Sequence, residues 1–156
     1  MNIRTATEAD LDHISALADE VAALHSDNEP EVFAGPNASR DREFWLSCIA
    51  QPEATVTVAT NDGTIVGFVT AKVTSINAPT FLKERAICRI GTIVVSSRAQ
   101  RQGIGTELIR SVEAWAKSKS VVETRLEVFA FNRRALSFYA SLGYAVRSHI
   151  LHKGLP

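Results

Sequence analysis

The sequence lacks most of the features that mark secreted, membrane-bound or nucleic-acid-binding proteins. It has only 2 cysteines in 156 residues, Cys48 and Cys88, with neither metal-ligand spacing nor a disulfide framework. No apolar run approaches the ~20 residues of a membrane span, and the first residues contain no apolar signal core. These absences lead us to expect a cytoplasmic protein that does not bind a membrane.

Charge of either sign is not in excess. Lysine and arginine together number 17, as do aspartate and glutamate, so no global field favours nucleic acid. The 4 histidines and the acidic residues form no visible cluster, and we therefore expect no metal site. What is present is an ordinary globular composition, 46% hydrophobic and 22% charged, at a length that predicts one domain over residues 1–156.

The most informative stretch is a strand that runs into a helix through a glycine turn. Ile93-Val94-Val95 is typical of a buried strand, and apolar residues from Ile104 onward recur at helical spacing. Between them, Gly103 and Gly105 allow a tight bend and a close approach of backbone amides to a ligand. A helix N-terminus of this kind suits a phosphate or pyrophosphate, although a turn that uses glycine for geometry alone is the alternative. No lysine follows either glycine, which excludes a P-loop, and Leu108 stands where a dinucleotide fingerprint needs its third glycine.

The remaining patterns predict an alternation of strands and helices. Thr7 to Asp10 is similar to a capping box, and Asn61-Asp62-Gly63 is a strong hairpin signal. Helices are predicted over 11–25, 40–50 and 103–117, and a short one between an Asn132 cap and Gly143. Strands are predicted over residues 2–6, 56–59, 65–69, 86–95, 124–129 and 144–151, with loops over 26–39 and 75–85. This order indicates a mixed α/β or α+β domain.

Two motifs make the chain resemble the GNAT family of N-acetyltransferases. The run from Gln100 to Gly105 resembles the family's Q/R-x-x-G-x-G loop, which holds the pyrophosphate of acyl-CoA. Asn132, Ala135, Tyr139 and Gly143-Tyr144 are similar to its N-x-x-A-x-x-x-Y-x-x-x-G-[FY] pattern. The resemblance covers nearly the whole chain, although the part before Ala54 matches by element order more than by residues. It implies a mixed central sheet, flanked by helices and splayed between the fourth and fifth strands.

The resemblance also implies where acetyl-CoA binds. The cofactor would enter between the strands at 86–95 and 124–129, pair with backbone groups at Ile93 and Val95, and leave its pyrophosphate on the amides of residues 101–106. The implied cofactor-binding residues are Ile93, Val94, Val95, Arg101, Gln102, Gly103, Ile104, Gly105, Thr106 and Asn132. Arg98, Arg101, Arg133 and Arg134 either reach the CoA phosphates or form a solvated face.

Two residues are implied to be catalytic. The Tyr139 hydroxyl would face the thioester sulfur and stabilise the leaving thiolate, with complete proton transfer as the limiting case. Glu127 is the candidate base, because the Leu-Glu-Val…Asn…Tyr spacing looks like that of ribosomal-protein alanine N-acetyltransferases. Alternatively, Glu127 forms an ion pair on the face of the sheet, and ordered water accepts the proton.

The expected function is therefore an acetyl-CoA-dependent N-acetyltransferase in which a primary amine attacks the thioester directly. The acceptor stays open between peptide or protein amines and small-molecule amines. A non-catalytic acyl-CoA sensor is the alternative. The resemblance also makes a homodimer an expectation, since dimers are common in the family.

Overall fold

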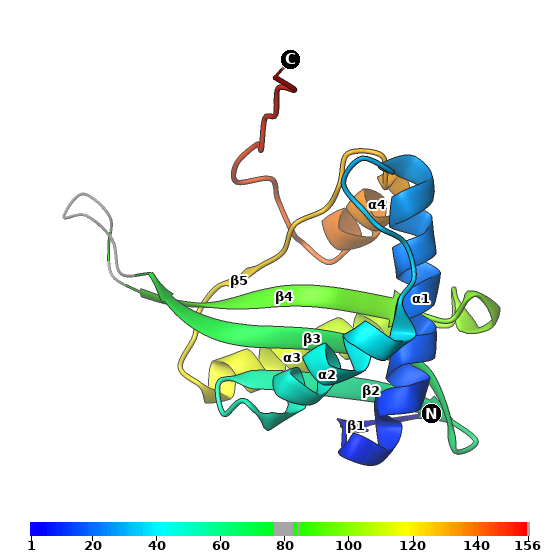
Figure 1. The fold of residues 1–156 in the computed structure, drawn as a ribbon. Helices are drawn as coiled ribbons and strands as arrows, with labels where there is room; N and C mark the ends of the chain where they lie inside the picture. Colours follow the sequence, from blue (N-terminus) through cyan, green and yellow to red (C-terminus); the bar gives the residue numbers. More distant parts are fainter. Residues whose placement is uncertain (77–82, 84, 156) are drawn as a thin grey trace.

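A single five-stranded mixed sheet forms the centre of the molecule (Figure 1), in a computed structural model that describes residues 1–76, 83 and 85–155. The strand order is β1-β2-β3-β4-β5, antiparallel except for the parallel pair β4–β5. The strands are β1 (Asn2–Thr5), β2 (Ala54–Asn61), β3 (Thr64–Ile76), β4 (Arg85–Val95) and β5 (Thr124–Arg125). The predicted mixed sheet is confirmed, and the predicted loop over 75–85 falls largely outside the described residues.

Helices cover both faces of the sheet. They are α1 (Leu11–Asn28), α2 (Ala38–Ala50), α3 (Ile104–Ser118) and α4 (Arg133–Ser141), with short 3-10 turns η1 (Glu8–Asp10) and η2 (Ser97–Ala99). In Figure 1, α1 and α2 lie before the sheet and α3 lies behind it. Among the described residues, no helix combines the length and the apolar character needed to cross a membrane.

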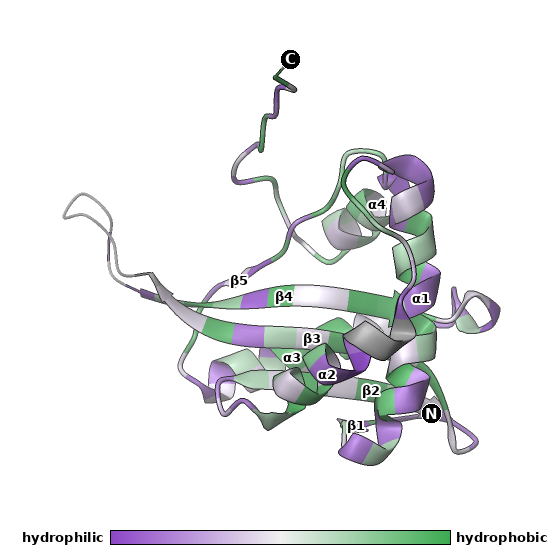
Figure 2. Ribbon diagram, in the orientation of Figure 1, coloured by the Kyte–Doolittle hydropathy of each residue, from purple (hydrophilic) through white to green (hydrophobic). Residues whose placement is uncertain are grey.

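Each face of the sheet has its own hydrophobic core, because side chains alternate between the faces along a strand. On the α1–α2 side, Trp45 packs with Phe68 at a ring-centroid distance of 5.4 Å, next to the fully buried Ile14. On the α3 side, Leu108 and Val112 are 0% exposed and pack against Val69. Figure 2, coloured by hydropathy, shows much green along the central strands and a mixture of green and purple on the helices that pack against them.

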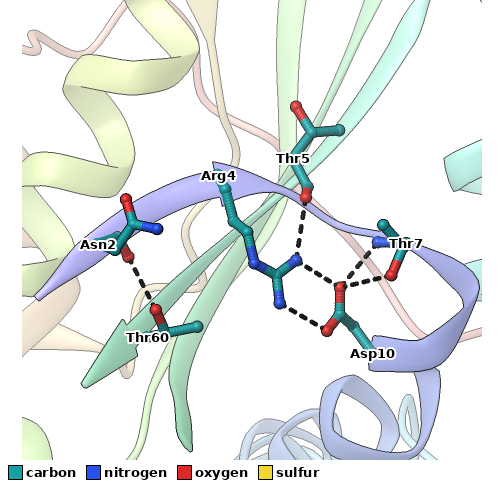
Figure 3. Close-up of polar contacts among 6 residues, drawn as sticks. All are labelled: Asn2, Arg4, Thr5, Thr7, Asp10 and Thr60. Carbon is teal, nitrogen blue, oxygen red and sulfur yellow. Dashed lines mark hydrogen bonds and ion pairs between the residues drawn. The ribbon is translucent and has the colours of Figure 1, made fainter. Parts of the chain in front are cut away.

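The first predicted turn is held by a carboxylate at its centre (Figure 3). Asp10 Oδ2 accepts a hydrogen bond from the Thr7 amide at 2.8 Å, which confirms the capping box. The Arg4 guanidinium donates to both Asp10 oxygens, at 2.7 and 2.8 Å. These hydrogen bonds hold the pKa of the Asp10 carboxyl well below its usual range. The hairpin prediction is confirmed too, because Asn61 pairs with Thr64 across Asp62 and Gly63, both at positive φ.

The sheet splits between β4 and β5. The pairing of these strands consists of Cys88 with Thr124 and Arg89 with Arg125, and β4 then continues to Val95 without β5 beside it. Figure 1 shows the chain after β5 rising away from β4 toward α4. The predicted splay between the fourth and fifth strands is therefore confirmed.

Two predicted strands are shorter than expected or absent, while the strands predicted over 56–59 and 65–69 extend to Ala54–Asn61 and Thr64–Ile76. The strand predicted over 124–129 ends at Arg125, and residues 144–151 form no strand at all. A strand needs a neighbour for its backbone groups, and the chain from 126 onward has diverged from β4 with no other described strand beside it. The last segment then extends away from the body, with Val146, Ile150 and Leu151 71–90% exposed (Figure 1).

Helix boundaries differ by less. The first helix runs three residues beyond the predicted His25, and the Asn28 side-chain amide donates to the Leu24 carbonyl at 2.8 Å in its last turn. The second helix begins at Ala38 rather than at 40, within the predicted loop. Side chains that compete with or extend a terminal turn are difficult to foresee from periodicity alone.

Candidate active site

A bulge in β4 prepares the split in the sheet. Ala71 pairs with Ile90 and Val69 pairs with Ile93, so Thr70 stands alone opposite Gly91 and Thr92. The Thr92 amide donates to the Thr70 hydroxyl at 2.9 Å instead of to a backbone carbonyl. A Cβ on Gly91 would lie 2.8 Å from that hydroxyl oxygen, so the bulge requires glycine here. A glycine inside a strand, such as Gly91, is the sequence signal of such a bulge.

The bulge decides which backbone groups face the gap. Before it, the Cys88 amide points to β5 and donates to the Glu123 carbonyl at 3.0 Å. After it, the Ser96 amide donates to Val66 of β3 at 2.8 Å. Because direction alternates along a strand, Ile93 and Val95 turn their amide and carbonyl groups away from β3. We call these groups the open edge of β4.

The residue between them has a different place. Val94 directs its backbone groups to β3, and its side chain is 4% exposed in the core beneath α1. It therefore sets the spacing of Ile93 and Val95 on the open edge. Gln100 was missed as a site residue, although it opens the sequence motif. Its side-chain amide donates to the Val95 carbonyl at 3.0 Å, which ties the end of the open edge to the turn that follows.

The turn and the start of α3 present a run of backbone amides. Arg101 and Gly103 have φ values of 62° and 80°, and Gly103 is the N-cap of α3. The first helical hydrogen bond in this run is donated by Glu107 to the Gly103 carbonyl at 3.1 Å. Within the described chain, the amides of residues 101–106 donate to no protein group. We call this run the amide loop, and it is a natural anion site at a helix N-terminus.

Cations and a second helix border the amide loop. Arg98, Arg101, Arg133 and Arg134 are exposed, and none of them forms an ion pair within the described part of the chain. A Cβ on Gly105 would lie 3.2 Å from the ring of Phe138, so this glycine lets α4 approach the start of α3. The glycine turn and the α4 motif, which are about 30 residues apart in the sequence, therefore lie next to each other in the fold.

Helix α4 begins and ends as its motif predicts. The Asn132 side-chain oxygen accepts a hydrogen bond from the Ala135 amide at 3.0 Å and caps the helix. Its side-chain nitrogen donates to no described protein group, so it stays available for a ligand. At the other end, Gly143 has a φ of 87°, and the Tyr144 amide donates to the Tyr139 carbonyl at 3.0 Å.

Tyr139 lies on α4 and is 8% exposed in the core on the α3 side. Its hydroxyl bonds to no described residue. The oxygen is not fully buried, so a ligand can reach it. Burial, with a smaller contribution from Tyr144, raises the pKa of Tyr139 to about 12. A neutral hydroxyl that keeps its proton this firmly acts as a hydrogen-bond donor.

Glu127 lies on the opposite side of the chain after β5. Leu126 and Val128 pack against the α3-side core, and Glu127 between them is exposed. It forms no ion pair or hydrogen bond with any described residue, so the sheet-face ion pair considered for it is absent from the described chain. The hydroxyl and the carboxylate thus come from opposite faces of the sheet. Among the described residues, no group of three or more histidine, cysteine or acidic side chains could hold a metal ion.

An aromatic cluster joins the loop after α1 to the chain after β5. The His25 ring lies 4.8 Å from Phe33 and 5.6 Å from Phe129, and Phe33 lies 5.0 Å from Phe129. The His25 Nδ1 atom is 2.8 Å from the Val21 carbonyl oxygen, which orients the ring. The cluster borders the α1–α2 side of the split beyond Glu127.

Comparisons with known proteins agree with this geometry. The chain matches the model of the Acetyltransferase (GNAT) family over residues 18–144. Its fold is similar to that of a mutant BH1408 protein from Bacillus halodurans, with a TM-score of 0.91 and 24% identity over 100% of both chains.

Two further solved structures share the fold. The aminoglycoside antibiotic 6'-N-acetyltransferase from Acinetobacter haemolyticus has a TM-score of 0.77 and 20% identity, over 100% of this chain and 99% of that chain. The aminoglycoside N-acetyltransferase AAC(6')-Iy, solved in complex with CoA, has a TM-score of 0.75 and 17% identity over 99% of both chains. No curated protein matches this sequence.

Proposed function

Because the chain belongs to the GNAT family of acetyltransferases, and is thus an acyltransferase with acetyl-CoA as co-substrate, we propose that it acetylates a primary amine by direct attack. One observation carries the proposal. The open edge of β4 and the amide loop follow one another along the chain, separated by the short η2 turn, and together they form a line of two backbone sites, at Ile93 and Val95 and at residues 101–106. A linear co-substrate with amides along its arm and a pyrophosphate at its end matches this line.

Different residues bind different parts of the cofactor. The amides of Arg101, Gln102, Gly103, Ile104, Gly105 and Thr106 hold the pyrophosphate. The open edge at Ile93 and Val95 forms hydrogen bonds with the pantetheine arm of the cofactor. The Asn132 side-chain nitrogen donates a hydrogen bond to the same arm from the opposite side of the split. Acetyl-CoA supplies an activated acetyl thioester at the far end of this line, beside the bulge.

The catalytic residues serve the two ends of the reaction. Glu127 accepts the proton of the attacking amine, directly or through water, on the α1–α2 side. Tyr139 donates a hydrogen bond to the sulfur as it leaves, on the α3 side. The Tyr139 pKa of about 12 against about 8.5 for a thiol makes complete proton transfer uphill by about 5 kcal/mol. Tyr139 therefore stabilises the thiolate as a donor rather than protonating it.

The alternative is a sensor that binds acyl-CoA without turnover. It shares the open edge and the amide loop, so binding of acetyl-CoA alone does not distinguish it from an enzyme. The unpaired Tyr139 hydroxyl and the unpaired Glu127 carboxylate favour the enzyme, because a sensor needs neither group.

An acceptor screen tests the proposal. Purified protein and acetyl-CoA are incubated with peptides, amino acids, polyamines and aminoglycosides, and the released CoA thiol is measured. We expect thiol release that depends on one class of amine. Tight binding of acetyl-CoA with no amine-dependent release would instead identify the protein as a sensor.

The proposal includes a homodimer. Tyr144 is anchored on the α3-side core, and the chain leaves the body of the protein after Arg147; the last segment exposes Val146, Ile150, Leu151 and Leu155. Several large apolar side chains exposed on one short segment are compatible with an interface. Light scattering on the full chain should give twice the 17.0 kDa mass of one chain, and a monomeric mass at micromolar concentration would contradict the dimer.

A further inference from the structure

A groove opens on the α2 side of the sheet at the bulge in β4. It has a volume of about 280 Å³ and lies between α2, which contributes Phe44 and Ser47, and the strands β3 and β4. Gly91 and Thr70, the two sides of the bulge, both line it. We call it the basic groove, for the two cations described below.

The position of the basic groove follows from the direction of the proposed cofactor line. That line runs from the amide loop back along β4 through Val95 and Ile93, so its acyl end reaches Gly91 and Thr92. The groove begins at Gly91, on the face opposite Tyr139. An acceptor that reaches the thioester from this side does not cross the arm of the cofactor.

Two cations form the floor of the basic groove. Lys72 and Arg89 are direct partners in the β3–β4 register, and both line the groove. Like charges directly opposite each other in a sheet are destabilising. Neither side chain forms an ion pair or a hydrogen bond within the described part of the chain, and no acidic residue lines the groove.

The neighbouring cation shows the contrast. Arg125 stands next to Arg89 in the parallel β4–β5 register, and its Nε donates to Glu123 Oε1 at 2.5 Å. Arg125 thus has an ion-pair partner, Glu123, which it shares with Arg85 and Arg147, whereas Lys72 and Arg89 have none among the described residues. Glu127, two residues after Arg125, is the unpaired carboxylate on the same side.

We infer that the acceptor is a primary amine that also carries an anionic group, a carboxylate or a phosphate, held by Lys72 and Arg89 in the basic groove. The ammonium end lies toward Glu127 and the anionic end toward the two cations. Arginine suits both anions, because its fork donates two parallel hydrogen bonds. A polycationic acceptor would meet two like charges here. The inference rests on the proposed function and specifies its acceptor.

Matched acceptors test the inference. β-Alanine is compared with propylamine, and 2-aminoethyl phosphate with ethanolamine, at equal concentrations of free amine. We expect kcat/KM to be about 10–100-fold higher for the anionic member of at least one pair, since a charge-assisted hydrogen bond has roughly that effect. The pair that shows the preference identifies carboxylate or phosphate. Equal or higher values for both neutral amines would overturn the inference.

Charge variants assign the preference to the groove. Arg89→Glu and Lys72→Glu should each remove the preference for the anionic amine, mainly through KM, and raise kcat/KM for 1,3-diaminopropane. Arg89→Lys, which keeps the charge, should restore part of the preference. The matched control is Lys117→Gln on α3, an exposed cation that should change nothing. An anionic preference that survives Arg89→Glu would also overturn the inference.

Calorimetry separates this inference from the proposed function. N-Acetyl-β-alanine and N-acetyl-2-aminoethyl phosphate are titrated into the wild type and Arg89→Glu without acetyl-CoA. Binding of either compound that is lost in Arg89→Glu supports the anion site even if no amine is acetylated, which would be a failure of the proposed function alone. Turnover of amines with no binding of either compound, and no anionic preference, would be a failure of the inference alone.

Discussion

The two sides of the split in the sheet present different kinds of chemical group. On the α3 side the available groups belong to the backbone: the open edge at Ile93 and Val95 and the amides of residues 101–106. On the α1–α2 side they are charged and aromatic side chains, including Glu127, Arg89 and Phe33. Backbone groups keep one geometry whatever the sequence, whereas side chains vary freely. Under the proposed function, the common co-substrate is bound mainly by backbone groups and the variable acceptor mainly by side chains.

The largest effect is expected from a substitution in the amide loop. Gly103→Glu should lower acetyl-CoA affinity by more than about 100-fold, because it places a carboxylate beside the pyrophosphate and a side chain at a φ of 80°. Calorimetric titration with acetyl-CoA measures the loss. Gly103→Asn is the control, since asparagine tolerates this backbone conformation without charge and nothing lies within 4 Å of the added Cβ. Unchanged affinity in Gly103→Glu would mean that the pyrophosphate binds elsewhere.

The next effect tests the side-chain side. Glu127→Gln should lower turnover by about 100-fold at neutral pH, as expected when a general base is removed. Raising the pH should restore part of the rate, because solvent then supplies the free amine. A pH–rate profile of both proteins with the best acceptor measures this, with Glu8→Gln as a control far from the split. Parallel profiles with equal rates would exclude Glu127 as the base.

A smaller effect is expected for Tyr139, where the two sides meet at the thioester. Tyr139→Phe should lower turnover by about 10–100-fold, the effect of one hydrogen bond to a developing charge. Tyr144→Phe is the matched control. Its hydroxyl lies 2.9 Å from Thr124 Oγ1 and 3.3 Å from Glu113, so the change should reduce stability by about 1 kcal/mol and leave turnover within about twofold. Wild-type turnover in Tyr139→Phe would refute a catalytic role.

The smallest effect concerns the bulge that orients the open edge. Gly91→Ala places a Cβ against the Thr70 hydroxyl and should lower turnover by about fivefold to tenfold, with a loss of about 1–2 kcal/mol in unfolding free energy. Adding Thr70→Ala should recover part of the stability, because it removes the clash. Denaturant unfolding of the single and double variants measures the coupling. Additive losses would show that the contact between Thr70 and Gly91 does not matter.

Much of the fold and of the backbone site could be predicted from the sequence, because the evidence for both is local. A switch from strand period to helix period around Gly103 predicts the turn, and Asn132 and Gly143 predict the ends of α4. Each depends on a few neighbouring residues whose conformational preferences do not need the rest of the chain. The assignments of Tyr139 and Glu127 as catalytic, and of residues 93–95, 101–106 and 132 as cofactor-binding, stay predictions.

The tertiary structure alone decided what depends on partners far apart in the chain. Residues 126–129 and 144–151 have strand-like patterns, yet they form no strand because no neighbouring strand accompanies them. Which backbone groups of β4 face the open edge depends on the bulge, where the Thr92 amide donates a hydrogen bond to the Thr70 hydroxyl 22 residues away. The unpaired charges of Lys72 and Arg89 likewise appear only when β3 and β4 lie side by side. A sequence determines local propensity by itself, but pairing is a property of two segments, and only the folded chain brings them together.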